Sequence, residues 1–339
     1  MKLLKRLLWP LALCVLALTM LLCIGVGSVP VPPGETARIL LAALRGRTAE
    51  AGVMGSIVLS VRLPRVMCAA LTGAALSLCG AAMQGLLRNP LADGSTLGVA
   101  SGASLGAVLA LSLGITIPGA PLAGTALLAM AFAFLSLLLI LSLAYALDRS
   151  LSTNSIILIG VIFSMFVSSL MSLIIAFSGE RVRSITFWTM GSLSGAGGAQ
   201  VLLLGAALLL GGAVILRRAR ELNAFALGED TARHVGVNVR RVKLTLLVAV
   251  SALVGVCVSV GGTIGFVGLV IPHMTRMVVG PNHARLLPAS MLSGAVFLLL
   301  ADLVSRTLLA PVELPIGVVT SMVGAAAFVF IFYRTRKGR

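Results

Sequence analysis

The sequence predicts an all-α membrane protein with about ten transmembrane helices. Of its 339 residues, 59% are hydrophobic and only 11% are charged, and the mean hydropathy is +1.11. Apolar runs recur along the whole chain at about 20 residues, the length that crosses a bilayer as a helix. Long polar stretches between these runs are rare. The composition therefore argues against a soluble globular protein.

The spans are delimited by charged stretches. They cover residues 7–27, 66–87, 95–114, 122–147, 153–177, 199–216, 244–261, 263–280, 287–308 and 314–333. Four of them, the third and the sixth to eighth, are short or rich in glycine, so nine or eleven spans stay open. We predict one transmembrane domain over residues 1–339, with an outer segment at 28–61 and a cytoplasmic loop at 217–243.

The first span opens the chain and shares some features with a secretory signal peptide. Lys2, Lys5 and Arg6 precede an apolar run that reaches Val26. Signal peptides have apolar runs of about 7–15 residues followed by a small-residue cleavage site. Because this run is longer and no clear cleavage site follows, we predict that the first span is retained.

Basic residues orient the spans, because Lys and Arg in short loops stay cytoplasmic. With both termini in the cytoplasm, eighteen of the 26 Lys and Arg residues lie inside. These are Lys2, Lys5, Arg6, Arg88, Arg149, Arg217, Arg218, Arg220, Arg233, Arg240, Arg241, Lys243, Arg276, Arg285, Arg334, Arg336, Lys337 and Arg339. The outer eight are Arg38, Arg45, Arg47, Arg62, Arg65, Arg181, Arg183 and Arg306. This bias explains most of the net charge of +16 without nucleic acid.

The second span has a distinctive residue pattern at each end. It opens with Arg62-Leu63-Pro64-Arg65 and is followed by the polar, proline-broken turn Asn89-Pro90-Leu91. In the orientation above, the two arginines face outward and the turn faces the cytoplasm. This arrangement predicts docking outside and gating inside.

Small residues recur at helical spacing in two further spans. Gly94, Gly98, Gly102 and Gly106 are four residues apart and predict a third-span face that packs closely on a neighbouring backbone. In the fifth span, Ser164, Ser168 and Ser172 form a weakly polar stripe. This stripe either lines a translocation path or packs with its hydroxyls bonded to its own helix, and both interpretations stay open.

The loop 217–243 predicts two short amphipathic helices at the cytoplasmic face. Gly228 would end the first, Glu229 and Asp230 suit the first turn of the second, and Gly236 would end that one. Exposed Phe225 and Leu227 would need a partner. The loop is therefore a candidate docking surface for another protein.

Ionisable groups within the spans are few, and none forms a recognisable catalytic or metal-binding set. Asp302 and Arg306 are four residues apart and predict an ion pair. His273 follows Pro272 as a lone imidazole. The five cysteines, Cys14, Cys23, Cys68, Cys79 and Cys257, lie inside apolar runs without C-x-x-C spacing. We therefore predict no metal site and no cofactor in this chain.

Five blocks of the sequence resemble the FecCD-type permeases, the membrane subunits of ABC importers for iron siderophores, haem and cobalamin. The blocks cover residues 62–92, 228–238, 265–273, 301–306 and 313–320. The resemblance extends over nearly the whole chain from Arg62. It implies a type II ABC importer permease fold with ten helices, in the bacterial cytoplasmic (inner) membrane.

The resemblance also implies partners and site residues. The partners would be a second permease subunit, two ABC ATPase subunits and an extracytoplasmic substrate-binding protein. Binding-protein docking falls on Arg62, Arg65 and Arg306, although Arg306 has its competing pair with Asp302. ATPase coupling falls on Leu227, Gly228, Glu229, Asp230, Ala232 and Gly236, and the cytoplasmic gate falls on Asn89, Leu91, Ser152 and Thr153. Asp230-Thr231-Ala232 departs from the first two residues of the wider E-A-A-x-x-x-G importer pattern.

The chain is expected to be a transport subunit without enzymatic activity. It contains no Gly-Lys dipeptide and hence no Walker A motif, so ATP and Mg²⁺ would be bound by the separate ATPase. A secondary transporter would show charged or broken helices at the membrane midplane, and an intramembrane enzyme would show a paired catalytic set. The sequence favours an ATP-driven permease over both. Iron siderophore is the expected cargo, with haem and cobalamin as alternatives, and homodimer against heterodimer stays open.

Overall fold

The computed structural model describes residues 2–27, 31–46, 52–94, 97–117, 121–149 and 152–337. Parts of the predicted outer segment and the start of the predicted third span lie outside these residues. The structure also does not describe the side chains of several cations that were predicted to lie on the cytoplasmic or the outer side. These are Lys2, Lys5, Arg6, Arg47, Arg334, Arg336, Lys337 and Arg339. Throughout the described residues the regular secondary structure is helical, which confirms the predicted all-α class.

Ten apolar helices coincide with the predicted spans. In chain order they are α1 (Lys2–Gly25), α4 (Leu63–Leu86), α5 (Val99–Leu113), α6 (Pro121–Leu147), α7 (Thr153–Ala176), α9 (Gly198–Arg217), α12 (Val239–Gly261), α13 (Val267–Val279), α14 (His283–Thr307) and α15 (Ile316–Lys337). Seven helical segments in the described chain are long and apolar enough to cross a membrane. The apolar parts of α5, α13 and α15 are shorter. That all ten cross the membrane stays a prediction.

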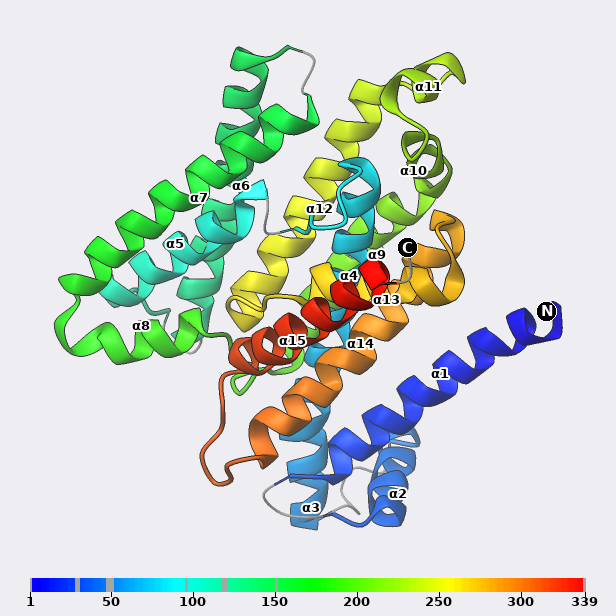
Figure 1. Ribbon diagram of the computed structural model, residues 1–339. Coiled ribbons are helices and arrows are strands. Elements are labelled where there is room, and N and C mark those ends of the chain that lie inside the picture. Colours follow the sequence, from blue (N-terminus) through cyan, green and yellow to red (C-terminus); the bar gives the residue numbers. More distant parts are fainter. Residues whose placement is uncertain are drawn as a thin grey trace.

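The connections contain short helices of their own. They are α2 (Pro33–Leu44), α3 (Gly52–Ser56), the π-helical turn η2 (Ile57–Arg62), the 3₁₀ turn η4 (Gly179–Arg181), α8 (Val182–Thr189), α10 (Ala219–Phe225) and α11 (Glu229–His234). Figure 1 shows α10 and α11 at one end of the bundle and α2 and α3 at the other. The predicted coupling loop and the predicted outer segment therefore lie at opposite ends.

The second predicted span is longer than its apolar pattern indicated. α3, η2 and α4 form one continuous helical segment, Gly52–Leu86, of 35 residues. The prediction began this span at residue 66 because Arg62 and Arg65 mark a break in the apolar run. The helix continues through both arginines because they are largely buried and paired inside the protein.

α4 is the central helix of the fold, and small residues let its neighbours approach closely. It packs against α9, α12, α13 and α14 (Figure 1). A Cβ at Gly73 would overlap the backbone of Gly294 on α14, and a Cβ at Gly80 would overlap the backbone of Gly268 on α13. Close backbone approach of this kind drives helix association in membranes, where helices gain little from the hydrophobic effect.

The predicted glycine stripe is half confirmed. Gly102 and Gly106 lie on α5 and pack against α6, where added Cβ atoms would overlap the side chain of Ser136 and the backbone of Leu128. Gly94 and Gly98 precede the helix, which begins only at Val99. The prediction of one helical face from 94 to 106 was wrong for these two, because Gly98 adopts a left-handed conformation that starts the helix late.

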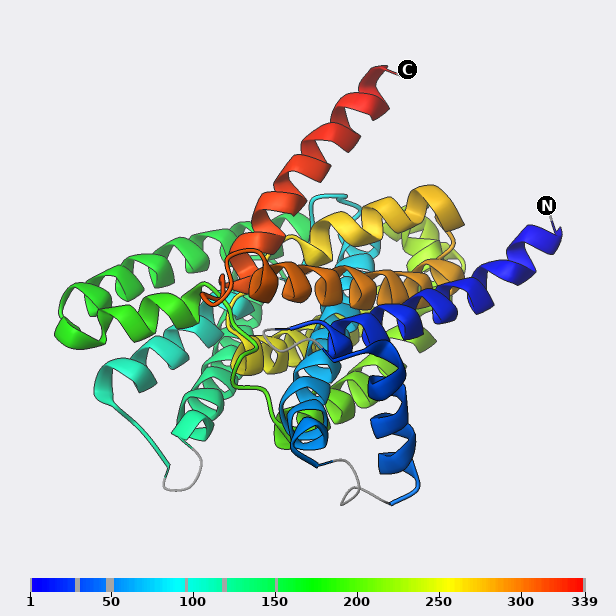
Figure 2. The same ribbon diagram turned by 90° about the horizontal axis from the view of Figure 1, so that it is seen from below.

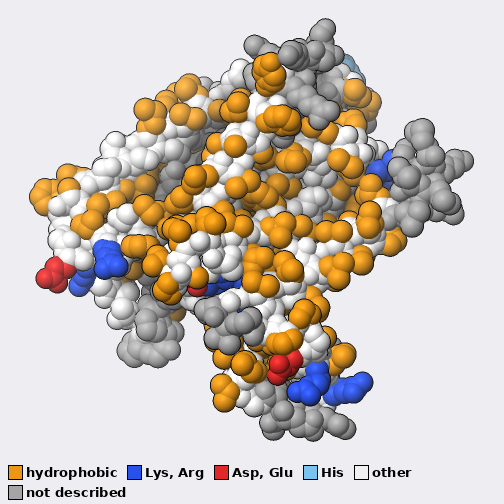
Figure 3. Space-filling view, turned by 60° about the horizontal axis from the view of Figure 1, so that its bottom comes forward, with side chains coloured by type: hydrophobic (Ala, Val, Ile, Leu, Met, Phe, Trp, Pro, Cys, Tyr) orange, Lys and Arg blue, Asp and Glu red, His pale blue; other side chains and the backbone are white. Residues whose placement is uncertain are grey.

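The outer surface of the bundle is apolar. Figure 3 shows a face covered mostly by hydrophobic side chains, with Lys, Arg, Asp and Glu side chains confined to a few small groups. In Figure 2, α1 and α15 project away from the other helices. A continuous apolar surface of this kind is expected where a protein contacts lipid or another membrane subunit.

We predict that Gly80→Ala destabilises the bundle, because the new methyl group would push α13 away from α4. Overpacking of this kind costs about 1–3 kcal/mol. Gly205→Ala on α9 is the matched control, since a Cβ there meets no atom within 4 Å. The measurement is the melting temperature of the detergent-solubilised protein. Equal melting temperatures for the two variants would contradict the packing described for α4.

Candidate functional site

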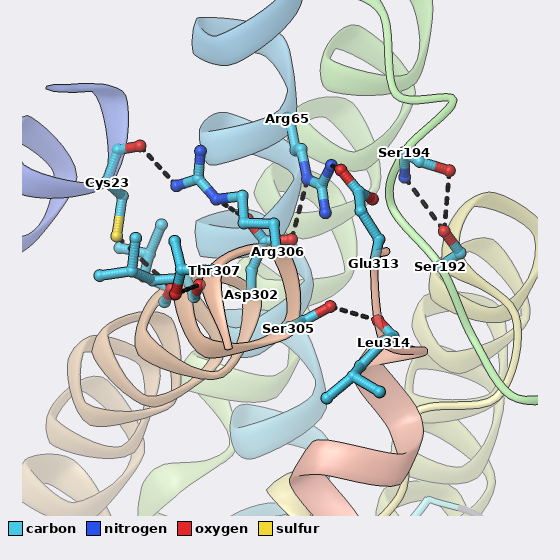
Figure 4. Close-up of polar contacts among 12 residues, drawn as sticks. Cys23, Arg65, Ser192, Ser194, Asp302, Ser305, Arg306, Thr307, Glu313 and Leu314 are labelled. Carbon is cyan, nitrogen blue, oxygen red and sulfur yellow. Dashed lines mark hydrogen bonds and ion pairs between the residues drawn. The ribbon is translucent and has the colours of Figure 1, made fainter. Parts of the chain in front are cut away.

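The three predicted docking arginines lie at one end of the bundle, and each is held by groups of the same chain. Figure 4 shows two of them, Arg65 and Arg306, on either side of Asp302. Arg65 Nε lies 2.9 Å from Asp302 Oδ1, and its Nη1 lies 2.9 Å from Glu313 Oε1. Asp302 Oδ2 lies 3.3 Å from Arg306 Nε, close enough for an ion pair but without hydrogen-bond alignment. The predicted pair of Asp302 with Arg306 is confirmed, and Arg65 joins it.

Two of these arginines also contact backbone carbonyls at the end of α1. Arg62 Nη1 donates hydrogen bonds of 3.0 Å to the carbonyls of Ile24 and Gly25. Arg306 donates to the carbonyl of Cys23. The arginine cluster thus joins α1, α4 and α14.

The two carboxylates of the arginine cluster differ in burial, and this difference separates a structural partner from a surface one. The Asp302 side chain is 1% exposed, whereas that of Glu313 is 43% exposed. A buried carboxylate is costly unless it is paired and hydrogen-bonded, so Asp302 depends on both arginines. Arg65 is the arginine that also holds an exposed partner. The cluster therefore presents Glu313, with Arg65 behind it, to the surface.

The coupling loop has the predicted two-helix form. α10 ends before Gly228, which has a φ of 115°, and α11 ends before Gly236, which has a φ of 87°. Both conformations favour glycine because a Cβ is strained there. Ala232 is buried, and Leu227 is 72% exposed. Phe225 was expected at the surface but lies fully buried in the core, since it is the last residue of α10 and faces the bundle.

Glu229 connects the coupling loop to the bundle. Its Oε1 lies 2.7 Å from Lys243 Nζ on α12 and accepts a 3.3 Å hydrogen bond from Thr153 Oγ1. The Lys243 side chain is 1% exposed, so the ammonium depends on this carboxylate. Thr153 is the first residue of α7. The first turn of α11 is therefore bonded directly to one of the predicted gate residues.

Both predicted gate turns border the junction of α10 and α11. In the first turn, Asn89 Oδ1 accepts a 2.9 Å hydrogen bond from the Leu91 amide, and the Leu91 side chain is exposed. The side chain of Arg88, next to it, lies beside Gly228. In the second turn, Ser152 caps α7 by accepting from the Ser155 amide. Gly228 therefore lies next to the first turn, and Glu229 lies next to the second.

The serine stripe faces away from the core of the chain. Ser168 and Ser172 are exposed and Ser164 is half-buried on α7. The Ser172 hydroxyl donates a 3.0 Å hydrogen bond to the carbonyl of Ser168, the local bond expected of a packing serine. The exposure fits a translocation path and the local hydrogen bond fits packing serines, so both interpretations stay open.

Sequence reasoning missed the groups that pair with the docking arginines and with the coupling loop. Lys243 was counted only as a cytoplasmic charge, and Glu313 was assigned no role. One signal was available for Lys243. It shares a helix face with Val239, Leu246 and Val250, all of which are apolar, so a buried ammonium with a carboxylate partner could have been inferred.

A bundle of long apolar helices is the architecture of a polytopic membrane protein, and comparison with known proteins identifies its family. The model of the FecCD transport family matches residues 15–334. The chain belongs to this family, and it is a permease of the ABC importer type.

Individual relatives cover nearly the whole chain. An uncharacterised ABC transporter permease protein, YvrB of Bacillus subtilis (strain 168), is 44% identical over 95% of this chain and 92% of its own length. The hemin transport system permease protein HmuU of Yersinia pestis is 40% identical over 86% and 87%. A solved inward-facing chain, described as from a metal-chelate type ABC transporter, superimposes with a TM-score of 0.83 at 33% identity, covering 97% of this chain and 99% of that one.

Proposed function

We propose that this permease imports an iron-siderophore complex by alternating access, driven by a separate ATPase. The observation that carries the proposal is the bonded link from Glu229 on the coupling loop to Thr153 at the gate. ATP-driven closure of the ATPase dimer would move α10 and α11, and the link would pass that movement to α7. The metal-chelate description of the similar solved structure supports a chelate as cargo. Haem is the second candidate, because the Yersinia pestis relative is a hemin permease.

The proposed complex contains a second permease subunit, two ABC ATPase subunits and an extracytoplasmic binding protein. ATP and Mg²⁺ would bind to the ATPase subunits. We place the complex in the bacterial cytoplasmic membrane with both termini in the cytoplasm, because that orientation puts most Lys and Arg residues inside. Leu227 and Val235, exposed before and after α11, are apolar groups available to an ATPase surface.

Docking of the binding protein is proposed at the arginine cluster, with Arg65 as the main contact. Arg62 and Arg306 are buried against the end of α1, so either one could reach a partner only if that end moved. Arg65 could reach a partner with a smaller structural rearrangement. An acidic group of the binding protein could replace Glu313, which is exposed, while Asp302 continues to hold the guanidinium.

The test of cargo uses the complete transporter in proteoliposomes with its binding protein. We expect ATP-dependent uptake of a ferric siderophore, with haem and cobalamin supplied as competitors. Uptake of haem or cobalamin alone would replace the siderophore assignment. Uptake driven by an ion gradient without ATP would overturn the ATP-driven mechanism.

We predict that Thr153→Val weakens coupling, because it removes the hydroxyl bonded to Glu229 and leaves the Lys243 pair in place. A hydrogen bond of this kind contributes about 1 kcal/mol, which corresponds to roughly a fivefold change. The measurement is substrate transported per ATP hydrolysed. Thr245→Val on α12 is the matched control, since its hydroxyl donates to the carbonyl of Arg241 in its own helix. Equal ratios for the two variants would argue against the Glu229 link.

We predict that Glu313→Gln tightens capture of the loaded binding protein, because Arg65 would no longer be shared with an exposed carboxylate. Exposed ion pairs are worth about 0.2–1 kcal/mol, so the dissociation constant should fall up to roughly fivefold at low salt. This dissociation constant is measured by surface plasmon resonance on the detergent-solubilised transporter. Weaker capture by this variant would show that Glu313 itself contacts the partner and would remove Arg65 from the docking surface.

A further inference from the structure

An apolar groove lies on the surface of the bundle between α1, α13 and α14. Its volume is about 430 Å³, which falls within the range of roughly 300–1,000 Å³ that ligand sites in proteins have. Among the described lining residues, Thr275 and Ser293 carry the hydroxyl groups, and the Thr275 hydroxyl already donates to the carbonyl of Ile271. The lining therefore suits a hydrocarbon ligand.

The groove exists because α1 is bonded to the bundle at its outer end and separates from it toward the N-terminus. Arg62 and Arg306 donate hydrogen bonds to the last carbonyls of α1. Figure 1 shows α1 diverging from α14 toward the N-terminus. The part of α1 that lines the groove, Leu8 to Val15, lies in this diverging half. Leu11 within it stays 64% exposed.

The length of the groove corresponds to one leaflet of a bilayer. Its lining runs from Ala289 to Val296 on α14 and from Ile271 to Val279 on α13. At 1.5 Å per residue these stretches are about 10–12 Å long. The hydrocarbon core is about 30 Å thick, so one leaflet contributes about 15 Å. In the proposed orientation the turn between α13 and α14 is cytoplasmic, which places the groove in the cytoplasmic leaflet.

The groove is small for a transmembrane helix of another subunit. A helix with its side chains is about 10–12 Å across, so a 12 Å length of it occupies on the order of 1,000 Å³. This is more than twice the groove volume of about 430 Å³. An acyl chain is much thinner than a helix. The volume therefore favours a lipid chain as the occupant.

A cation lies one helical turn beyond the groove, on the face of α14 that lines it. Arg285 precedes Ala289 by four residues and Leu292 by seven, which is the spacing of one helix face. Arg285 is exposed, and its guanidinium forms no ion pair or hydrogen bond with the described part of the chain. The sequences 2–25, 267–279 and 283–301 contain no Asp or Glu. This end of the groove therefore favours an anionic head group.

Trp9 lies in the groove lining toward the same end as Arg285, because the opposite ends of α1 and α14 meet at the arginine cluster. Indole rings concentrate at the level of the lipid head groups in membrane proteins. The Trp9 indole N–H is a hydrogen-bond donor without a partner in the described residues. It is available to an oxygen of a phospholipid at the level where the acyl chain joins the head group.

We propose that this groove binds an anionic glycerophospholipid of the cytoplasmic leaflet, with one acyl chain between α1, α13 and α14 and the phosphate near Arg285. Basic pockets between transmembrane helices on the cytoplasmic side bind anionic head groups in this way. The lipid would fill the gap that the diverging half of α1 leaves. The site does not depend on which cargo the permease carries, so failure of the siderophore assignment would leave it untouched.

The test uses the two tryptophans of the chain, Trp9 and Trp188. Trp188→Phe leaves Trp9 as the only indole in the purified full-length permease, which is placed in phosphatidylcholine vesicles. A small, equal share of the lipid is replaced by phosphatidylglycerol or phosphatidylcholine with brominated acyl chains, which quench indole fluorescence on contact. We expect Trp9 to prefer brominated phosphatidylglycerol by about fivefold, the factor that one cation near the membrane surface supplies.

Two matched pairs of variants test the head group and the chain separately. Arg285→Gln should remove the preference for phosphatidylglycerol, whereas Arg217→Gln should keep it, because Arg217 is an exposed cation at the end of α9. Ala12→Phe should fill the groove and weaken quenching by both lipids. Ala17→Phe is its control, since Ala17 is exposed on the same helix outside the groove lining.

Four results would overturn the lipid site. The first is equal quenching by the two brominated lipids, and the second is a preference that Arg285→Gln and Arg217→Gln leave alike. The third is displacement of the lipid by glycerol phosphate in solution, which would show a site for free phosphate. The fourth is a Trp9 that neither lipid quenches, which would show that a protein segment, such as a second copy of this chain, covers the groove.

Discussion

Close packing around α4 is the constraint on which the rest of the bundle depends. Its small residues at Gly73 and Gly80 place the backbones of α14 and α13 directly against it, without intervening side chains. In a membrane this contact must supply much of the helix association, because lipid tails solvate apolar side chains as well as a neighbouring helix does. The arginine cluster lies at the start of this helix and the gate turn follows its end. The position of α4 therefore sets the position of both.

The sequence predicted the positions of the helices and the two-helix form of the loop 217–243 well because their signals are local. Apolar length located all ten helices, and Gly228 and Gly236 marked the ends of α10 and α11 because they adopt conformations that favour glycine. The start of α5 was misplaced because spacing alone does not distinguish a helical glycine from one that precedes a helix. The family resemblance added the assignment to an ABC importer, which the FecCD match confirms.

The partners of the charged residues could not be predicted because they come from distant parts of the chain. Arg65 and Asp302 are 237 positions apart, and Thr153 and Glu229 are 76 apart. Periodicity carries no information about such pairs. As a result, arginines that pattern and resemblance presented as free docking groups proved to be bonded within the chain. Their structural role and any role in docking must therefore be considered together.

The continuous helix Gly52–Leu86 has a consequence for the height at which partners meet the permease. Its 35 residues span about 52 Å at 1.5 Å per residue. The hydrocarbon core of a bilayer is about 30 Å thick, so roughly two-fifths of this helix exceeds that thickness. The helix α2 contacts η2 near the start of this segment, so the length of the segment sets how far α2 lies from the Leu86 end. The distance between the two ends of the bundle is thus fixed by the length of one helix.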